Sequence, residues 1–240
     1  MKGSKLVNRC QVSPNHEPRS CDVGLLVLHY TGMETGQYAV DWLCNPISKV
    51  SCHYLIDVDG TIVQMVDEDR RAWHAGKSSW HGMIDINSAS IGIEIQNLGH
   101  TGGLPAFPKV QMECVAALCL DIMLRFELSP HHVLAHSDVA PGRKIDPGEK
   151  FDWDFLAESG IGQMVIAQNH NDVVEKLSEA QRKLQNIGYG LETTGQPDNR
   201  TRIVVEALQR RYRRAKVDAV LDQQTLDILN RLLATQSAAS

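Results

Sequence analysis

The chain lacks the features that would place it in several broad classes of protein. Its six cysteines contain no Cys-x-x-Cys pair, which argues against a zinc ribbon or a thioredoxin-type redox site. No apolar run approaches the roughly 20 residues of a membrane-spanning helix. A net charge of −5 argues against a general nucleic-acid or anionic-membrane binder. The 240 residues have the composition of an ordinary globular protein, large enough for one domain and a smaller module.

The amino-terminal stretch, residues 1–20, has basic residues but no apolar segment of a secretory signal. We therefore expect a cytoplasmic protein; a periplasmic or cell-envelope protein whose leader has been removed is the alternative. Cys44 and Cys52 could form a disulfide in an oxidising compartment, but free thiols are expected without a leader. Cys114 and Cys119 fall on a helical pattern and are expected to act as small apolar side chains. Sequence alone leaves the oligomeric state open.

Hydrophobic patterns in the first two thirds of the chain predict strands mixed with helices. Strands are expected at Leu25–Leu28, His53–Val58, Thr61–Val66, Ser90–Gln96 and His132–His136. The dipeptide Asp59-Gly60 predicts a hairpin between the second and third of these. The continuous apolar run ending at His29 predicts a strand buried on both faces. The fold class is therefore α/β, with a mixed central sheet of about five strands flanked by helices.

Two helices are predicted in the same region. Tyr38–Leu43 is a short one that ends before Asn45-Pro46. The longer one runs from Pro108 to Leu128, with an apolar stripe at helical spacing formed by Val110, Cys114, Ala117, Leu118, Ile122 and Phe126.

The composition changes near residue 168, where the polar stretch Gln168–Asp172 begins. Helices are expected at Val173–Ile187, Thr201–Arg214 and Asp222–Leu233, which together would form a compact three-helix module. We therefore divide the chain into a catalytic domain, residues 1–165, and a module, residues 173–236. The run Arg210-Arg211-Tyr212-Arg213-Arg214 is interpreted as a solvated helix face or, alternatively, as a contact for a polymer or a phosphate.

Two histidines and one aspartate stand at positions where α/β sheets build their sites. His29 and His136 each end a predicted strand, and Asp146 lies in the loop Val139–Gly148 that follows. Two imidazoles and one carboxylate would leave the fourth position of a zinc ion open for water, as in catalytic zinc sites. The alternative is that these are ordinary residues at strand ends, since most of the ten histidines must be bystanders.

Three further features carry chemistry if that site exists. Glu94 lies on the strand face opposite Ile91, Ile93 and Ile95, where it could act as a general base; the polar face of an edge strand is the alternative. Lys144 could stabilise a negatively charged oxygen, although a surface lysine is the default. Trp73-His74 places an aromatic and an imidazole on a glycine-containing loop.

Taken in order, these stretches resemble the zinc-dependent N-acetylmuramoyl-L-alanine amidases of the AmpD and AmiD type, a family that includes peptidoglycan recognition proteins. The resemblance covers about residues 20–157. The motifs that carry it are Val27-Leu28-His29-Tyr30-Thr31, His53-Tyr54-Leu55-Ile56, Arg71-Ala72-Trp73-His74-Ala75-Gly76, Ser90-Ile91-Gly92-Ile93-Glu94 and His136-Ser137-Asp138-Val139-Ala140-Pro141-Gly142-Arg143-Lys144-Ile145-Asp146-Pro147-Gly148.

The resemblance implies a role for each candidate residue. It implies one Zn²⁺ per chain, held by the side chains of His29, His136 and Asp146. It makes Glu94 the acid/base carboxylate and Lys144 the cation that stabilises the oxyanion. It implies that Tyr30, Trp73 and His74 line a substrate groove. Some phage relatives carry a catalytic tyrosine beside the position of His53; Cys52 stands there, so His53 is expected to support the structure or a ligand.

The tail is similar to the three-helix peptidoglycan-binding module that often follows such amidases. The match rests on Glu179–Gln185, Gly188-Tyr189 and Leu221–Thr225, and the tail departs from it at Leu208 and Ala219. The implied activity is hydrolysis of the amide bond between the lactyl group of N-acetylmuramic acid and L-alanine, in peptidoglycan or in muropeptides, including 1,6-anhydromuramyl peptides. The alternatives are a recognition protein that binds muramyl peptides without cutting them and a zinc hydrolase acting on another amide.

Overall fold

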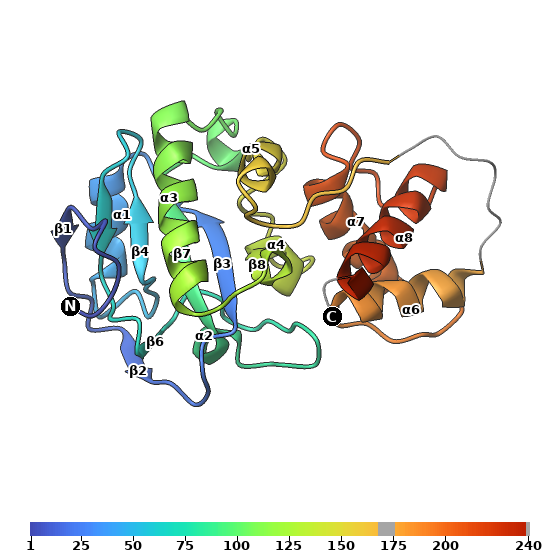
Figure 1. Cartoon of the computed structure of the whole chain (residues 1–240), viewed down its shortest axis with the longest axis horizontal. Coiled ribbons are helices and arrows are strands. Elements are labelled where there is room, and N and C mark those ends of the chain that lie inside the picture. The colour runs from blue at the N-terminus through green and yellow to red at the C-terminus, as the bar shows by residue number, and fades with distance from the viewer. Residues whose placement is uncertain (168–175, 239–240) are drawn as a thin grey trace.

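A computed structural model describes residues 1–167 and 176–238. The first range forms a β-sheet with helices on both faces, and three more helices follow (Figure 1). The polar stretch Gln168–Asp172 and the first residues of the helix expected at Val173–Ile187 lie outside the described residues. Within the described part of the chain, no helix is both long enough and apolar enough to cross a bilayer.

The central sheet has six strands in the order β1-β5-β4-β7-β3-β8. They are Arg9–Cys10 (β1), Leu25–Tyr30 (β3), Tyr54–Ile56 (β4), Ile62–Gln64 (β5), Ser90–Ile95 (β7) and Val133–Ala135 (β8). The expected mixed sheet is confirmed, as is the antiparallel hairpin of β4 and β5. The sheet has one strand more than expected, the edge strand β1. This strand pairs over only two residues, which are too few to show a hydrophobic period in the sequence. His16–Pro18 (β2) and Arg70–Ala72 (β6) form a separate antiparallel pair.

Strands β4, β7, β3 and β8 run parallel, so their carboxyl ends meet at one edge of the sheet. Strand β3 lies between β7 and β8 and is buried on both faces, as its continuous apolar sequence predicts. Its even-numbered side chains, such as Leu26, point to one face and its odd-numbered ones, such as Val27, to the other. The same alternation sends His29 to the face opposite Leu28.

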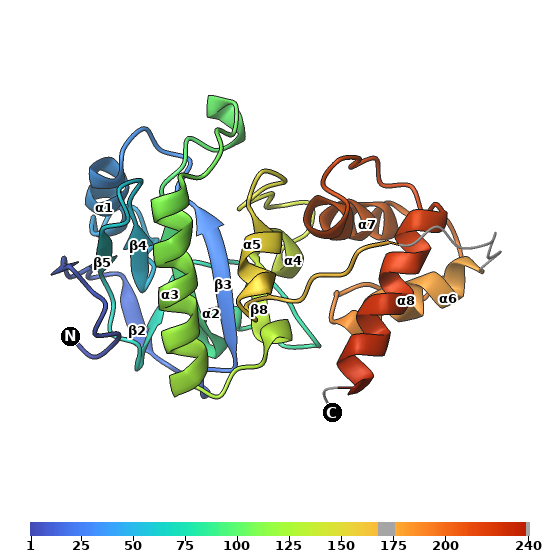
Figure 2. The same cartoon turned by 45° about the horizontal axis from the view of Figure 1, so that its top comes forward.

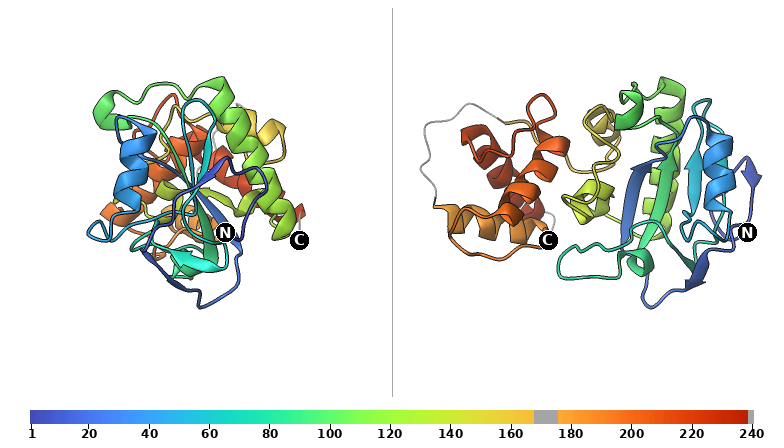
Figure 3. Two further views of the ribbon diagram at one scale, coloured as in Figure 1. Left: turned by 90° about the vertical axis from the view of Figure 1, so that its left-hand side faces the viewer. Right: turned by 180° about the vertical axis from the view of Figure 1, so that it is seen from behind.

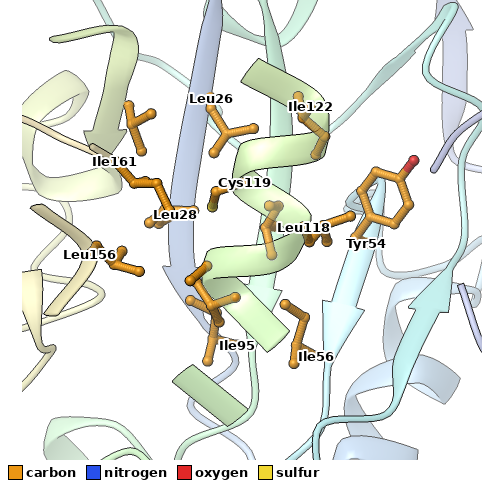
Figure 4. Packing of buried hydrophobic residues seen from close by; sticks show 14 of the residues in the cluster. Leu26, Leu28, Tyr54, Ile56, Ile95, Leu118, Cys119, Ile122, Leu156 and Ile161 are labelled. Carbon is orange, nitrogen blue, oxygen red and sulfur yellow. The ribbon is translucent and has the colours of Figure 1, made fainter. Parts of the chain in front are cut away.

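Helix α3, Lys109–Arg125, covers one face of the sheet. Figure 4 shows Leu118, Cys119 and Ile122 of this helix packed over Leu26 of β3 and Tyr54 of β4. The expected apolar stripe was partly wrong: Val110 is 47% exposed, while Met112 and Val115 are buried. The helix is apolar on more than one side, and the sequence pattern alone could not show which side meets the sheet.

The opposite face is covered by two groups of side chains. Helix α1, Gly36–Leu43, packs Val40 and Leu43 against Leu55 and Val63 of the hairpin. Leu25 and Val27 instead belong to a second apolar cluster. Three short helices complete this part of the chain: Ile86–Ala89 (α2), His136–Val139 (α4) and Trp153–Glu158 (α5). All six cysteines are free thiols. Two 3₁₀ turns are found at His100–Gly102 and Pro130–His132.

The three expected carboxy-terminal helices are present at Leu177–Ile187 (α6), Asn199–Tyr212 (α7) and Gln223–Ala238 (α8). Asp198 caps α7 by accepting a hydrogen bond from the Thr201 backbone N–H. Gly188 ends α6 with a φ of 129°, a conformation that favours glycine.

The carboxy-terminal helices pack directly against the sheet-containing part of the chain. The cluster that holds Leu25 and Val27 continues into Leu184 of α6 and Val204 and Leu208 of α7. Helix α7 lies beside α4 in both Figure 1 and Figure 2. The loop between β6 and α2 extends toward α6 (the right-hand view of Figure 3). It brings the Trp80 ring against that of Tyr189, with the ring centroids 5.0 Å apart.

Candidate metal centre and cleft

The carboxyl ends of β3, β7 and β8 form the floor of a cleft of about 430 Å³. His29 is the fifth residue of β3, and His136 begins helix α4 immediately after β8. Asp146 comes from the loop that follows α4. The backbone N–H of Ser137 donates to the carbonyl oxygen of Asp146 at 3.0 Å, which holds that loop against the start of α4.

One atom from each of these three side chains converges on a single point. His29 Nδ1 lies 2.8 Å from His136 Nδ1, and Asp146 Oδ2 lies 2.9 Å from His136 Nδ1 and 3.2 Å from His29 Nδ1. All three residues are buried. Among the described residues, this is the one group of three histidine, cysteine or acidic side chains that could hold a metal ion.

A chain of hydrogen bonds fixes which nitrogen of His29 carries the proton. The Ser90 hydroxyl donates to the carbonyl oxygen of Ile86 at 2.5 Å, so its oxygen can accept from His74 Nε2 at 3.2 Å. With its proton on Nε2, His74 accepts at Nδ1 from His29 Nε2, 3.0 Å away. His29 Nδ1 is then left without a proton and faces the convergence point.

His136 has the same tautomer. Its Nε2 lies 3.1 Å from the carbonyl oxygen of Ala75, which can only accept, so Nδ1 carries the free lone pair. Burial, followed by the neighbouring His136, lowers the pKa of His29 to about 4, which favours a neutral ring. Two lone pairs and a carboxylate oxygen would repel one another unless a cation lay among them. The donor set therefore fits Zn²⁺ with an open fourth position.

Glu94 lies beside this centre, in register with His29 on the neighbouring strand β7. Because β7 is an interior strand, the alternative of an edge-strand polar face is wrong. Glu94 Oε2 is buried, with no hydrogen-bond partner among the residues that the structure describes. Burial raises the pKa of Glu94 well above its ordinary value, and the charge of Asp146 raises it further, against the opposing effect of Lys144.

The other candidate residues lie in the cleft wall. Lys144 lines the cleft and forms no ion pair with any residue in the ranges 1–167 and 176–238. Tyr30 and Trp73 also line it; the Trp73 Nε1 atom is buried and has no partner in the described part of the chain. His74 is buried, and both of its ring nitrogens are engaged by His29 and Ser90.

The position of the His74 ring requires a residue without a side chain at position 92, which is Gly92. A Cβ atom on Gly92 would lie 2.4 Å from His74 Cγ, closer than any side chain tolerates. His53 is buried further back: the Gly92 N–H donates to its Nδ1 at 2.9 Å, and its Nε2 lies 3.0 Å from the Arg70 carbonyl oxygen. Burial lowers the pKa of His53 to about 3. These contacts agree with the supporting role expected for His53.

Sequence reasoning missed two contributors to the site. Ser90 controls the tautomer of His74, yet a serine at the start of a strand carries no distinguishing signal. Trp42 lines the cleft from α1, and the sequence predicted only that it lies in a short helix. Both contributions depend on which faces of separate elements meet.

Comparisons with known proteins agree with this geometry. The family described as N-acetylmuramoyl-L-alanine amidase matches residues 19–149, and the peptidoglycan binding domain family matches residues 174–229. The chain belongs to the N-acetylmuramoyl-L-alanine amidase family. Enzymes of this family hydrolyse the amide bond between the lactyl group of N-acetylmuramic acid and L-alanine. The expected family, enzyme class and fold are therefore confirmed.

Two curated relatives illustrate the match. The amidase AmiD of Escherichia coli is 32% identical over 231 residues, which cover 88% of this chain and 82% of AmiD. The 1,6-anhydro-N-acetylmuramyl-L-alanine amidase AmpD of Citrobacter freundii is 35% identical over 160 residues, 59% of this chain and 83% of AmpD.

Two solved structures extend over both parts of the chain. AmpDh3 from Pseudomonas aeruginosa, in complex with an anhydromuramic pentapeptide, has a TM-score of 0.80 at 31% identity and covers 89% of this chain and 92% of its own. AmiD from E. coli, in complex with anhydro-N-acetylmuramic acid-L-Ala-D-gamma-Glu-L-Lys, has a TM-score of 0.77 at 30% identity. The match covers 94% of this chain and 93% of the AmiD chain.

Proposed function

We propose that this amidase is zinc-dependent and that His29 Nδ1, His136 Nδ1 and Asp146 Oδ2 hold the ion. The observation that carries the proposal is the convergence of these three acceptor atoms within 3.2 Å of one another beside Glu94, whose Oε2 has no partner among the described residues. When bound, zinc supplies a Lewis acid that polarises a carbonyl group and makes water acidic enough to lose a proton near neutral pH.

Glu94 is the proposed general base and acid. Its raised pKa makes it a good proton acceptor, and its unpartnered Oε2 leaves an oxygen free to meet a water at the floor of the cleft. Glu94 accepts the proton of the attacking water and returns it to the alanine nitrogen as the carbon–nitrogen bond breaks. The tetrahedral carbon loses the amine and becomes the lactyl carboxylic acid, which gives its proton to water and leaves as the carboxylate.

Lys144 is the proposed stabiliser of the negative charge that develops on the carbonyl oxygen. It lines the same cleft, and its charge acts on both His29 and Glu94. Tyr30 and Trp73 are proposed to contact the substrate, with the Trp73 indole N–H as a donor. The hydrogen bonds of His74 favour a role in orienting His29 over direct contact with the substrate.

The proposed substrates are peptidoglycan fragments, including 1,6-anhydromuramyl peptides. The support comes from AmpDh3 and AmiD, whose structures hold anhydromuramyl peptides and match this chain across both its parts. We propose that residues 1–165 cut the bond and that residues 173–236 bind the cell wall. The cytoplasmic location stays a prediction, which fractionation of the native protein would test.

The decisive experiment is the release of the peptide amino group from a purified anhydromuropeptide. We expect cleavage that a chelator abolishes and added zinc restores. Binding without cleavage by the zinc-loaded protein would instead identify a recognition protein. Cleavage of simple acyl-alanine amides at the same rate as the muropeptide would favour a hydrolase that acts on other amides.

A further inference from the structure

The arginine run 210–214 folds inward, so its interpretation as a solvated helix face was wrong. Its four arginines are all at least three-quarters buried and all form ion pairs within the chain. Arg210 pairs with Glu206 and lies 3.6 Å from Glu149, Arg211 pairs with Asp138, Arg213 with Asp218 and Asp222, and Arg214 with Asp154. Of the four, Arg213 alone pairs only within the carboxy-terminal part of the chain, with the segment between α7 and α8. The other three reach across to the sheet-containing part.

Arg211 contacts the chain on both sides of His136. One guanidinium nitrogen donates to Asp138 Oδ2 at 2.6 Å, in helix α4. The other donates to the carbonyl oxygen of Val133 at 3.0 Å, in strand β8. The guanidinium also stacks over the ring of Trp153, with its central carbon 4.1 Å from the ring centroid. His136 lies between the two anchored residues, at the junction of β8 and α4.

Asp138 is the point where the carboxy-terminal helices hold α4. Its Oδ1 accepts a hydrogen bond from the Tyr189 hydroxyl at 3.0 Å, and its Oδ2 also accepts from the backbone N–H of Ala135 at 2.9 Å. The side chains of Asp138 and Arg211 are 1% and 2% exposed. A buried carboxylate with three such contacts needs its partners, because an unpaired charge in this environment would be strongly unfavourable.

We propose that Arg211 and Tyr189 are positioning residues for the metal centre, acting through Asp138 on the orientation of His136. The proposal rests on the zinc site proposed above. It makes the carboxy-terminal helices a structural part of that site, in addition to any contact they make with the wall.

The test is zinc affinity, measured on the full chain by competition with a chromophoric chelator. We expect Arg211→Gln to weaken zinc binding about tenfold and Tyr189→Phe to weaken it severalfold, in the range found when groups that orient ligands are lost. Arg211→Lys should recover part of the loss, since an ammonium keeps the charge but cannot span Asp138 and Val133 together.

Arg213→Gln is the matched control. Arg213 has the same 2% side-chain exposure as Arg211 and also forms two ion pairs, but with Asp218 and Asp222, which are 28% and 31% exposed and lie far from His136 in the sequence. Its zinc affinity should stay within about twofold of the parent. Equal losses in the Arg211 and Arg213 variants would overturn the proposal, as would unchanged affinity in folded Arg211→Gln.

If Arg211→Gln fails to fold, Tyr189→Phe decides the question, because it removes one hydroxyl and leaves the ring packed against Trp80. Unchanged zinc affinity in that variant would then overturn the proposal. Failure of the parent protein to bind one zinc ion is a separate result, which would remove the zinc site itself.

Discussion

Glu94 and His29 occupy paired positions on neighbouring parallel strands, which explains why a carboxylate lies in the middle of the sheet. A carboxylate there whose Oε2 has no partner among the described residues costs desolvation free energy, so a role at the adjacent centre is the physical reason to keep it. The hydrogen-bond chain from Ser90 to His29 is the second residue-scale feature. A substitution at Glu94 and one at Ser90 each change a measurable property of the site, turnover or zinc affinity, that can be distinguished from loss of the fold.

Glu94→Gln should bind zinc as the parent does and lose turnover about a thousandfold, since it removes proton transfer but keeps size and shape. Zinc content and the rate of peptide release from an anhydromuropeptide measure the two effects. Activity within tenfold of the parent would remove Glu94 from the mechanism.

Ser90→Ala should weaken zinc binding about tenfold. Without the hydroxyl, His74 no longer has an acceptor for its Nε2 proton, and the tautomer that receives the His29 proton loses its preference. Chelator competition measures the change. Ser88→Ala is the control, because Ser88 is also fully buried but its hydroxyl oxygen accepts from the Ser20 N–H. Equal affinities in the two variants would contradict the tautomer assignment.

At the scale of elements, α3 stabilises the sheet that positions the site. Its buried side packs on β3, β4 and β7, while Leu120 and Leu124 are turned to solvent, 42% and 82% exposed. Leu118 and Leu124 lie on the same helix, but Leu118 is fully buried and Leu124 is exposed. Comparing substitutions at these two positions measures the contribution of the packing of α3 to stability.

Leu118→Ala should lower the free energy of unfolding by about 3 kcal/mol, because Leu118 is fully buried and the substitution leaves a cavity. Leu124→Ala, on the same helix, should lower it by less than about 0.5 kcal/mol. Urea unfolding followed by circular dichroism gives both values. Similar losses in the two variants would mean that α3 meets the sheet through another face.

At the scale of the whole molecule, the two parts of the chain share one continuous apolar cluster and the ion pairs of Arg210, Arg211 and Arg214. A Cβ on Gly142 would lie 2.6 Å from Cγ2 of Ile203, so the loop after α4 and helix α7 approach closely. Such an interface should make the two parts unfold together.

We expect calorimetry of the full chain to show one thermal transition whose midpoint rises with zinc concentration, since ligands that bind only the folded state stabilise it. At a hundredfold excess of zinc over its dissociation constant, the stabilisation should be about 2.7 kcal/mol. His136→Ala should remove the zinc dependence. A separate transition of the carboxy-terminal helices that zinc does not move would show that the parts unfold independently.

Several features of the fold and site could be predicted from single residues and short patterns. The run ending at His29, the alternation around Glu94 and the turn at Asp59-Gly60 are local signals, and the strands at these positions are confirmed. The position of β1 could not be predicted, since two residues carry no period. The buried side of α3 could not either, because its sequence is apolar on several sides.

The sequence by itself determined the family, the α/β class and which side chains are capable of metal and proton chemistry, because those depend on residue type and local order. The tertiary structure alone decided that Ser90 orients His74 and that Arg210 and Arg211 of α7 face the sheet-containing part. These relations join residues 16 and 73 positions apart. They arise only when separate elements bury their surfaces against one another, which no local pattern records.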